Sequence, residues 1–541
     1  MGTLTRYAFA LGVITLSSQL LSAQQPWDWG FGHAGHIWDI ATDADGYSYV
    51  VGHAYDTVGF MGVQTDPGGG FLAKVSPTGS MIWTQTFTNA IFLEIELKND
   101  LLYATGEGET NVVVGSHSFF VDPGQGWACL VASFDTTGND LWVNCLRSPE
   151  DISANDLDVN DAGELFIAGT GREAIYTNTD TLYLNSPWAQ VLILKYAPGG
   201  SVEWITTAGC ISSETFATGI ACDELGAAYI TGSAYDGMFV DCDSLEFGPF
   251  TMPSTSSFFL TKVDGAGDFV WLRHAFGAMA TDVEYLGGNA VAVIGNFSDS
   301  TNAVGTSTLL SQTTDMFMGS FDLDGVPGWS YRSEAANDPA LCGGRTLDRS
   351  PDGGLFALSS GSGSILFDGT TVNTTGHGVQ VSKFAVDGTR QWTAVMEGHP
   401  DTNWFSHYGG LASDQEGRAY VAGCFNSGTP SAWLTLGTYS VTGTLNGFSL
   451  YVARTNDITE GLPEAALPDF SIYPNPTSGI IRVEGITANA QVTFTDARGR
   501  VVVPSRIAKG LFDMNGMDDG MYMIRIRDGA HDGIGRVVVM R

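Results

Sequence analysis

Positive charge is scarce in this sequence, and charge of either sign is limited. Of 541 residues, 24 are Lys or Arg and 59 are Asp or Glu, which gives a formal net charge of −35. Such a surface repels nucleic-acid phosphates and anionic lipids, so neither is an expected partner. The excess of negative charge is unevenly distributed along the chain. Residues 24–468 hold 14 Lys/Arg and 51 Asp/Glu, whereas residues 469–541 hold 9 Lys/Arg and 8 Asp/Glu. More than one structural part is therefore expected.

Cysteine is also sparse, and its spacing excludes a sulfur-bound metal. The seven cysteines include no CxxC pair and no alternation with histidine. Cys129 and Cys145 lie symmetrically about the turn in CLVASFDTTGNDLWVNC, so a regular hairpin in an exported chain predicts a disulfide between them. The other five comprise three whose pairing stays open and two expected to be small buried apolar residues: Cys210, Cys222 and Cys242, and Cys342 and Cys424.

Long apolar runs are absent except at the N-terminus. Residues 1–23 combine Arg6, the apolar stretch AFALGVITL and the small-residue ending LSA before Gln24, which is typical of a secretory signal peptide. After that segment no apolar run reaches the ~18 residues that a membrane-spanning helix needs. We therefore expect an exported chain without a transmembrane helix.

Recognisable catalytic and metal-binding motifs are missing as well. The sequence has no GxSxG, HExxH, Walker or Rossmann motif, and its nine histidines form no ligand pair at metal-binding spacing. The acidic turns DADG (Asp43–Gly46) and DLDG (Asp322–Gly325) resemble fragments of calcium loops but lack the remaining ligands, which favours turn chemistry and leaves calcium as an alternative. No cofactor, catalytic residue or metal ligand is assigned, because 51 acidic residues single out no carboxylate pair.

Glycine and tryptophan are what the sequence has in a regular pattern. It contains 69 glycines, and tryptophans that begin short extended segments recur at intervals of 54 to 67 residues. An apolar strand and a tight turn precede most of them, as in FLAKVSPTGSMIW and VSKFAVDGTRQW. The repeated positions are Trp29, Trp83, Trp142, Trp204, Trp271, Trp329 and Trp392. A fixed period of this length predicts a repeat architecture.

A second hairpin upstream in most units completes a four-stranded sheet. Segments such as DIATDADGYSYVVG and LASDQEGRAYVAG alternate apolar and polar residues, as half-buried strands do. A lone four-stranded sheet cannot cover both faces and is buried only against neighbouring sheets, so the units predict blades of a propeller. The seventh unit lacks its last strand, which PWDWGFGHAG (residues 26–35) supplies from the N-terminus. The predicted class is all-β: a seven-bladed β-propeller over 24–457, closed by that N-terminal strand.

The repeat unit itself resembles a known family. An apolar strand, D-x-x-G, an aromatic strand ending in Gly and then K-x-(D)-x-x-G-x-x-x-W is similar to the SBBP repeats of bacterial seven-bladed β-propellers. The resemblance covers residues 26 to about 457. It implies the fold, and it implies little about function, since one fold hosts many functions.

A linker at 458–468 precedes a different unit at 469–541. Its alternating segments predict a small Ig-like antiparallel β-sandwich. The unit resembles the type A C-terminal sorting domain of the type IX secretion system. The matching residues are Tyr473, Pro474, Asn475, Pro476, Gly479, Gly520, Tyr522 and Arg541. The resemblance implies recognition by the type IX translocon, so we expect a protein that is secreted or held on the outer face of the outer membrane.

The sequence favours binding over catalysis. The leading hypothesis is an adhesion, binding or scaffold protein that engages a glycan or a protein through propeller loops. A polysaccharide-active hydrolase or lyase on the same scaffold is the main alternative, and it predicts acidic or histidine side chains converging at one mouth of the ring. A purely structural part of a surface layer is the third.

Overall fold

The computed structural model describes residues 27–456 and 471–540, apart from short gaps. The chain divides into two units, residues 1–458 and residues 459–541. The predicted signal peptide, the predicted linker, Cys242, Asn475, Pro476 and Arg541 lie outside the described residues. The gaps are 54–68, 123–125, 178–180, 185, 187, 211–213, 236–243, 255, 305–307, 336–340, 369, 399–401, 406–408, 428–432, 437–438, 443–447, 475–476, 485–489, 497–499, 519 and 529–530.

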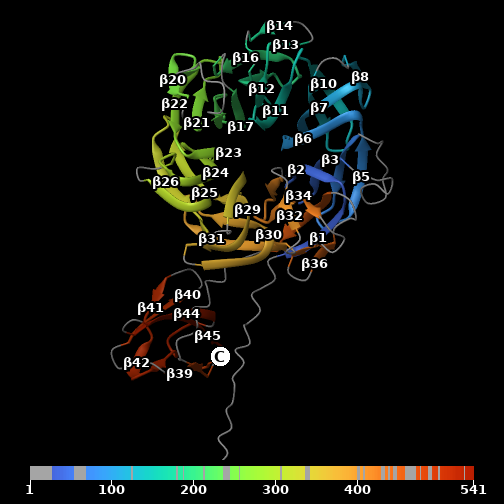
Figure 1. The fold of residues 1–541 in the computed structure, drawn as a ribbon. Helices are drawn as coiled ribbons and strands as arrows, with labels where there is room; N and C mark the ends of the chain where they lie inside the picture. Colours follow the sequence, from blue (N-terminus) through green and yellow to red (C-terminus); the bar gives the residue numbers. More distant parts are fainter. Residues whose placement is uncertain are drawn as a thin grey trace, which may run out of the picture. The chain divides into compact units, whose positions relative to one another are not determined.

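The first unit consists of antiparallel sheets that follow one another along the chain (Figure 1). Four sheets of consecutive strands are β2 (His36–Thr42), β3 (Ser48–His53), β4 (Gly70–Val75) and β5 (Met81–Thr86); β6 (Thr88–Lys98), β7 (Leu101–Val114), β9 (Ala128–Asp135) and β10 (Asp140–Leu146); β11 (Ile152–Val159), β12 (Leu165–Gly171), β15 (Gln190–Tyr196) and β16 (Val202–Ala208); and β17 (Glu214–Cys222), β18 (Ala228–Tyr235), β21 (Phe258–Val263) and β22 (Phe269–Ala275). These are called sheets 1 to 4.

Sheets 5 to 7 repeat the arrangement. They are β23 (Ala278–Tyr285), β24 (Ala290–Thr301), β25 (Leu309–Asp322) and β26 (Pro327–Arg332); β28 (Leu341–Arg349), β29 (Leu355–Phe367), β30 (Thr370–Phe384) and β31 (Arg390–Gly398); and β33 (Leu411–Ser413), β34 (Ala419–Ser427), β37 (Phe448–Thr455) and β1 (Trp27–Ala34), with β32 (Thr402–Phe405) also on β34. Short additions are β8 (His117–Phe120), β13 (Ala174–Tyr176), β14 (Thr181–Tyr183), β19 (Ser244–Phe247), β20 (Phe250–Pro253), β27 (Glu334–Ala335), β35 (Trp433–Leu436) and β36 (Tyr439–Thr442).

The first strands of the sheets contact one another in sequence around a central channel. β2 contacts β6, and the contacts continue through β11, β17, β23, β28 and β33, which contacts β2 again. Within the described residues this gives seven sheets in a ring (Figure 1). The described part of the chain contains no helix, and hence none that could cross a membrane. The predicted all-β class is confirmed.

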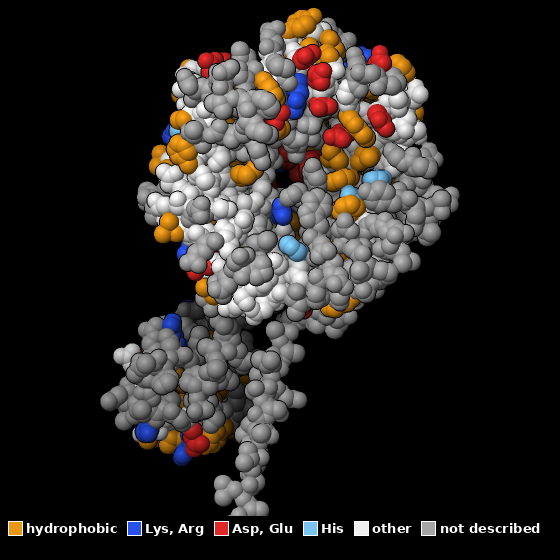
Figure 2. All heavy atoms as spheres, viewed as in Figure 1, with side chains coloured by type: hydrophobic (Ala, Val, Ile, Leu, Met, Phe, Trp, Pro, Cys, Tyr) orange, Lys and Arg blue, Asp and Glu red, His pale blue; other side chains and the backbone are white. Residues whose placement is uncertain are grey.

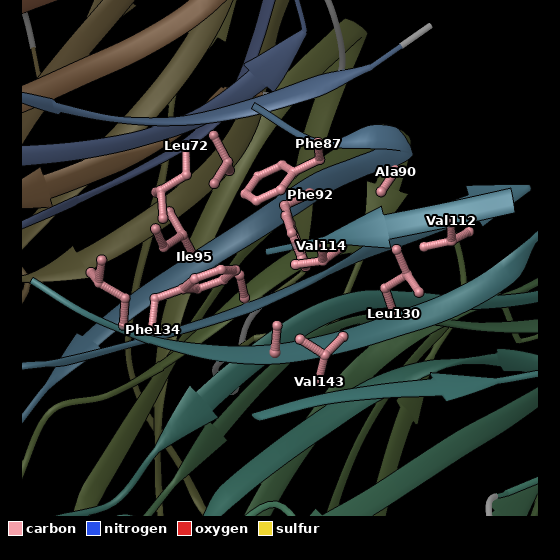
Figure 3. Packing of buried hydrophobic residues seen from close by; sticks show 14 of the residues in the cluster. Leu72, Phe87, Ala90, Phe92, Ile95, Val112, Val114, Leu130, Phe134 and Val143 are labelled. Atoms are coloured by element: carbon pink, nitrogen blue, oxygen red, sulfur yellow. The ribbon is translucent and has the colours of Figure 1, made fainter. Parts of the chain in front are cut away.

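Apolar side chains fill the space between neighbouring sheets. Between sheets 1 and 2, Phe87, Phe92 and Phe134 lie with ring centroids 5.0 to 5.8 Å apart, and Leu72 and Ile95 belong to the same buried cluster (Figure 3). Each sheet therefore buries both faces only because it has a neighbour on each side.

Most of the repeated tryptophans connect one sheet to the next. Five of them donate their indole Nε1–H to a turn carbonyl in the following sheet, at 2.9 to 3.2 Å: Trp29, Trp142, Trp204, Trp271 and Trp329. The glycine two residues further on lies under the same ring. At Gly388 φ is +80°, and an added Cβ would lie 2.4 Å from the Trp329 indole, so the position requires glycine for both reasons.

The N-terminal strand belongs to the last sheet. β1 pairs antiparallel with β37, with Trp29 opposite Arg454 and Ala34 opposite Ser449. Asp28 forms an ion pair with Arg454. Trp27 is buried and donates to the Val395 carbonyl of sheet 6 at 3.0 Å, whereas Trp29 donates to Pro77 of sheet 1 at 2.9 Å. One strand thus links sheets 6, 7 and 1.

The predicted Cys129–Cys145 disulfide is wrong, because both cysteines are free and buried. A register shift between Asp140 and Trp142 places Cys145 opposite Leu130 and Cys129 opposite Leu146. Since strand side chains alternate between faces, a shift of one residue puts the two thiols on opposite sides of the sheet. Cys210 is disulfide-bonded, and the remaining described cysteines, Cys222, Cys342 and Cys424, are free and buried.

The second unit consists of two four-stranded antiparallel sheets over one core. Ile481, Phe494, Phe512, Ile524 and Val537 are buried between them. The strand orders are β38 (Ser471–Tyr473), β39 (Ile480–Glu484), β43 (Leu511–Asp513), β42 (Ser505–Ala508), and β41 (Val501–Val502), β40 (Gln491–Asp496), β44 (Gly520–Asp528), β45 (His531–Val539). This is the arrangement of a small sandwich.

Deleting residues 24–36 is expected to lower the melting temperature of the whole first unit. The deletion removes the strand that pairs with β37 and the indoles of Trp27 and Trp29, and it leaves an unpaired sheet edge. Differential scanning calorimetry measures the change. Deleting only residues 24–26, which precede β1, is the control, and an unchanged melting temperature for the longer deletion would contradict the role of β1.

Candidate functional site

Each of the first six innermost strands carries a β-bulge at or just before its middle. The pairing register shifts at Ile37/Asp39, Phe92/Glu94, Ala154/Asp156, Ala217/Gly219, Ala280/Asp282 and Gly344/Thr346. A bulge leaves one extra residue unpaired and turns its side chain in a new direction. The extra residues, called the bulge residues below, are Trp38, Leu93, Asn155, Thr218, Thr281 and Arg345.

All six bulge residues line one cavity at a mouth of the channel. This upper cavity has a volume of about 680 Å³, which is in the range of small-molecule sites. Phe216 and Met279 extend its apolar lining beside Trp38 and Leu93. Figure 2 shows a hollow at the centre of the ring with acidic side chains in its depth and hydrophobic side chains on its rim.

Two rows of carboxyl groups lie below the bulge residues. Side chains two residues apart on a strand share a face, so the pattern acid-x-acid directs both carboxyls toward the axis. The first row is Asp39, Glu94, Asp156 and Asp282, and the second row is Glu96, Asp158, Glu284 and Asp348. None of these residues was singled out from the sequence, although the acid-x-acid pattern in FLEIELK, NDLDVN and TDVEYL was the available signal.

Several of these carboxylates hydrogen-bond to the backbone of the next sheet. Asp39 Oδ2 accepts the Ile95 N–H at 2.8 Å, and Asp282 Oδ2 accepts the Leu347 N–H at 2.7 Å. Asp156 and Asp158 accept the N–H groups of Ile220 and Cys222, both at 2.6 Å. These N–H groups lie on strand edges that face the channel, so the carboxylates satisfy donors that no strand pairs.

Three bulge residues make the complementary bond. Asn155 Nδ2 donates to the Ala217 carbonyl at 2.8 Å, Thr218 Oγ1 to Ala280 at 3.0 Å, and Thr281 Oγ1 to Gly344 at 3.3 Å. These bulge residues thus donate hydrogen bonds to the neighbouring innermost strand, and the carboxylates below them accept hydrogen bonds from it. Part of the polar lining is therefore used by the fold.

Burial changes the ionisation of the carboxyl rows. Loss of water raises the pKa of Asp39 to about 7, of Asp282 to about 6 and of Asp348 to about 7. Burial and neighbouring carboxylates raise the pKa of Glu94, Glu96 and Glu284 well above its usual range. The carboxyl groups of Asp39 and Glu94 lie close enough to influence each other's pKa, and both pKa values are raised.

The opposite mouth of the channel holds a smaller and more polar cavity of about 390 Å³. Glu96 and Asp348 of the second row line it together with Lys98 and Arg349. Lys98 forms an ion pair with Asp161 at 2.6 Å. Asp348 Oδ2 is buried and has no hydrogen-bond partner within the described part of the chain.

In each acidic turn, the first Asp side chain accepts hydrogen bonds from backbone N–H groups of the same turn. Asp43 Oδ1 accepts the N–H groups of Asp45 and Tyr47, and Asp322 Oδ1 accepts those of Asp324 and Val326. Turn chemistry therefore accounts for the D-x-x-G pattern. Among the described residues no group of three or more Asp, Glu, His or Cys is placed to hold a metal ion.

The described sorting-motif residues are divided between the two sheets of the second unit, with Tyr473 in one sheet and Gly520 and Tyr522 in the other. Tyr473 is partly exposed on β38, and the Gly479 N–H donates to Thr477 Oγ1 at 3.1 Å. Gly520 begins β44, and Tyr522 is buried with its hydroxyl donating to the Asp518 carbonyl at 2.9 Å.

Acidification from pH 8 to pH 5 is expected to stabilise the first unit. The folded-state pKa values of Asp39, Asp282 and Asp348 lie above the ~3.9 of an unfolded Asp, so the folded chain binds more protons between these limits and stability falls as pH rises through them. Asp348 interacts electrostatically with carboxyls from several sheets (Glu96, Glu284, Asp39, Asp282), and the cations Lys98 and Arg349 line the same cavity.

Asp348→Asn should therefore raise the melting temperature by a few degrees at pH 8 and leave it nearly unchanged at pH 5, as measured by thermal unfolding at both pH values. Asp268→Asn, at an exposed turn, is the control. A variant that melts below the native chain at pH 8 would contradict the unfavourable ionisation of Asp348.

Residues 471–540 match the family described as the secretion system C-terminal sorting domain. The match indicates export through the type IX route to the cell surface or the extracellular space, and it implies interaction with the type IX secretion machinery. None of the curated proteins matches the chain in sequence.

Solved structures with similar folds are distant in sequence. A polysaccharide lyase, Uly1, is 11% identical, with 82% of this chain and 94% of that chain covered and a TM-score of 0.39. PorZ, a surface component of the type IX secretion system of Porphyromonas gingivalis, is 13% identical, with 94% and 99% covered and a TM-score of 0.16. A prolyl endopeptidase is 12% identical, with 72% of this chain and 45% of that chain covered and a TM-score of 0.33. This chain therefore spans less than half the length of that protein.

Proposed function

We propose that this chain is an exported binding protein whose first unit receives a ligand in the upper cavity. The observation that carries the proposal is the set of bulge residues. A β-bulge at the equivalent position of each strand directs all six side chains into a single cavity of about 680 Å³. Their side chains differ in size, polarity and charge although their backbone positions are equivalent. Variable side chains on a rigid, repeated frame favour recognition over scaffolding alone.

We also propose that the propeller type and the export signals are those that the sequence predicts. An SBBP-type seven-bladed propeller, a cleaved signal peptide at 1–23 and a type A sorting domain would together give a single large cargo with an export signal at each end. The matched sorting domain supports the C-terminal part of this layout.

A hydrolase or lyase is the second candidate, and the Asp39–Glu94 pair favours it. Two half-buried carboxyls with raised pKa values beside a ligand-sized cavity have the ingredients of a general acid and a general base. Asp39 is also held by the Ile95 N–H, which gives that carboxylate a structural task. Binding remains the function that the geometry supports best.

A glycan array run beside a polysaccharide-degradation assay tests the proposal and separates the two candidates. Met279→Trp should reduce binding of the array ligand at least about tenfold, because Met279 is half exposed at the cavity rim and a larger side chain obstructs it. Val326→Trp, an exposed position in the β25–β26 turn of the same sheet, is the matched control. Equal binding by both variants would place the ligand elsewhere, and product release from the polymer would favour the enzyme.

Residues 458–541, fused to a periplasmic reporter, should carry it to the surface of a bacterium that has the type IX route. The sorting-domain match lies within this segment. Protease accessibility on intact cells measures the outcome, and a fusion that ends at residue 519, without β44 and β45, is the control. A full-length fusion retained in the periplasm would contradict the assignment.

A further inference from the structure

We propose that the ligand of the upper cavity is a glycan with free amino groups, bound with a protonated amine among the first-row carboxyls. This inference rests on the proposed function, because it assigns a substrate class to the same cavity. It follows from the distribution of apolar surface, from the polar atoms that the fold leaves unused, and from the charge of the lining.

The lining combines apolar and polar side chains around the ring. Trp38 and Leu93 of sheets 1 and 2, Phe216 of sheet 4 and Met279 of sheet 5 are apolar, whereas Asn155, Thr218 and Thr281 of sheets 3 to 5 are polar. A sugar ring offers the same two kinds of surface, with C–H groups on its faces and hydroxyls at its edge. A compact ring with donors in several directions suits this lining better than a single extended lysine side chain does.

The polar atoms that remain available are mostly acceptors. Asn155, Thr218 and Thr281 donate their hydrogen bonds to the neighbouring sheet. Asn296 Oδ1, in contrast, is buried in the lining and accepts no hydrogen bond within the described part of the chain. The first-row carboxyls keep further acceptor capacity after their backbone bonds. A ligand rich in donors would satisfy these atoms, and an ammonium group supplies three.

The charge of the lining favours a cation. Five carboxyl groups and one guanidinium line the cavity: Asp39, Glu94, Glu107, Asp156, Asp282 and Arg345. Arg345 Nε donates to Ser360 Oγ at 2.9 Å. The second row adds four carboxyls below, so a uronate or sulfate would enter an unfavourable field. An ammonium group is attracted instead, and it favours release of the protons that the buried carboxyls hold.

Titration calorimetry of the full mature chain at pH 6 tests the class of ligand with three probes: a β-1,4-glucosamine trimer, its N-acetylated counterpart and a galacturonate trimer. The glucosamine trimer should bind at least about tenfold more tightly than the N-acetylated trimer, and the galacturonate trimer should not bind. Glu94→Gln, which keeps the shape of the side chain, should weaken glucosamine binding at least about tenfold. Glu109→Gln, an exposed position on β7 of the same sheet, should leave binding unchanged.

The outcomes distinguish this inference from the proposed function. Equal binding of the two glucosamine-based trimers, or tighter binding of a trilysine peptide, would overturn the amino-glycan assignment and leave the cavity as a site. Binding of any array ligand that is insensitive to both Glu94→Gln and Met279→Trp would overturn the two together. A loss of glucosamine binding in Glu94→Gln, with an unchanged melting temperature, would support both.

Discussion

The structure depends on one constraint: a four-stranded sheet must bury both faces and satisfy its inner edge, and it can do so only against a neighbour. Two kinds of bond meet this need in the first unit. At the outer rim, an indole N–H reaches the turn of the next sheet and covers its glycine, as Trp329 does over Gly388. At the channel, a carboxylate accepts a backbone N–H of the next innermost strand, as Asp282 does from Leu347. Both bonds run between consecutive sheets, so the bonded residues lie 57 and 65 residues apart in the sequence.

The same constraint gives the channel its chemistry. Carboxylates that satisfy inner-edge N–H groups must lie close together around the axis, so burial and mutual repulsion raise their pKa values. The bulges near the middle of six innermost strands turn six further side chains into the upper mouth. A feature that originates in backbone hydrogen bonding thus leaves a cavity whose floor is acidic and whose wall differs from sheet to sheet.

The sequence predicted the parts of this structure that depend on local pattern. Turn glycines, alternating strands and the tryptophan period are each set by a few neighbouring residues, and β1, which lies within PWDWGFGHAG, pairs with β37. The Cys129–Cys145 disulfide was predicted wrongly because a bulge of one residue at Asp140/Trp142 reverses the face of a side chain. No residue of that hairpin signals the bulge by type.

The candidate site was harder to predict for a related reason. Asp39 and Asp282 are far apart in sequence and resemble many other acidic residues in a chain with 59 of them. Only the arrangement of the sheets in a ring brings both carboxyls to the lining of the upper cavity. Only the bulges of the innermost strands place Trp38 and Arg345 at equivalent positions. Only the hydrolase or lyase alternative predicted acidic or histidine side chains converging at one mouth, and the sequence did not indicate which residues these would be.

Hydrogen–deuterium exchange of the innermost strands tests the central claim most directly, because that claim concerns particular amides. The N–H groups of Ile95, Ile220, Cys222 and Leu347 lie at the channel edge and are held by carboxylates of the preceding sheet. They should exchange as slowly as amides paired within a sheet. Exchange within seconds, as at exposed turns, would contradict the hydrogen bonds between these N–H groups and the carboxylates, and with them the ring that depends on these bonds.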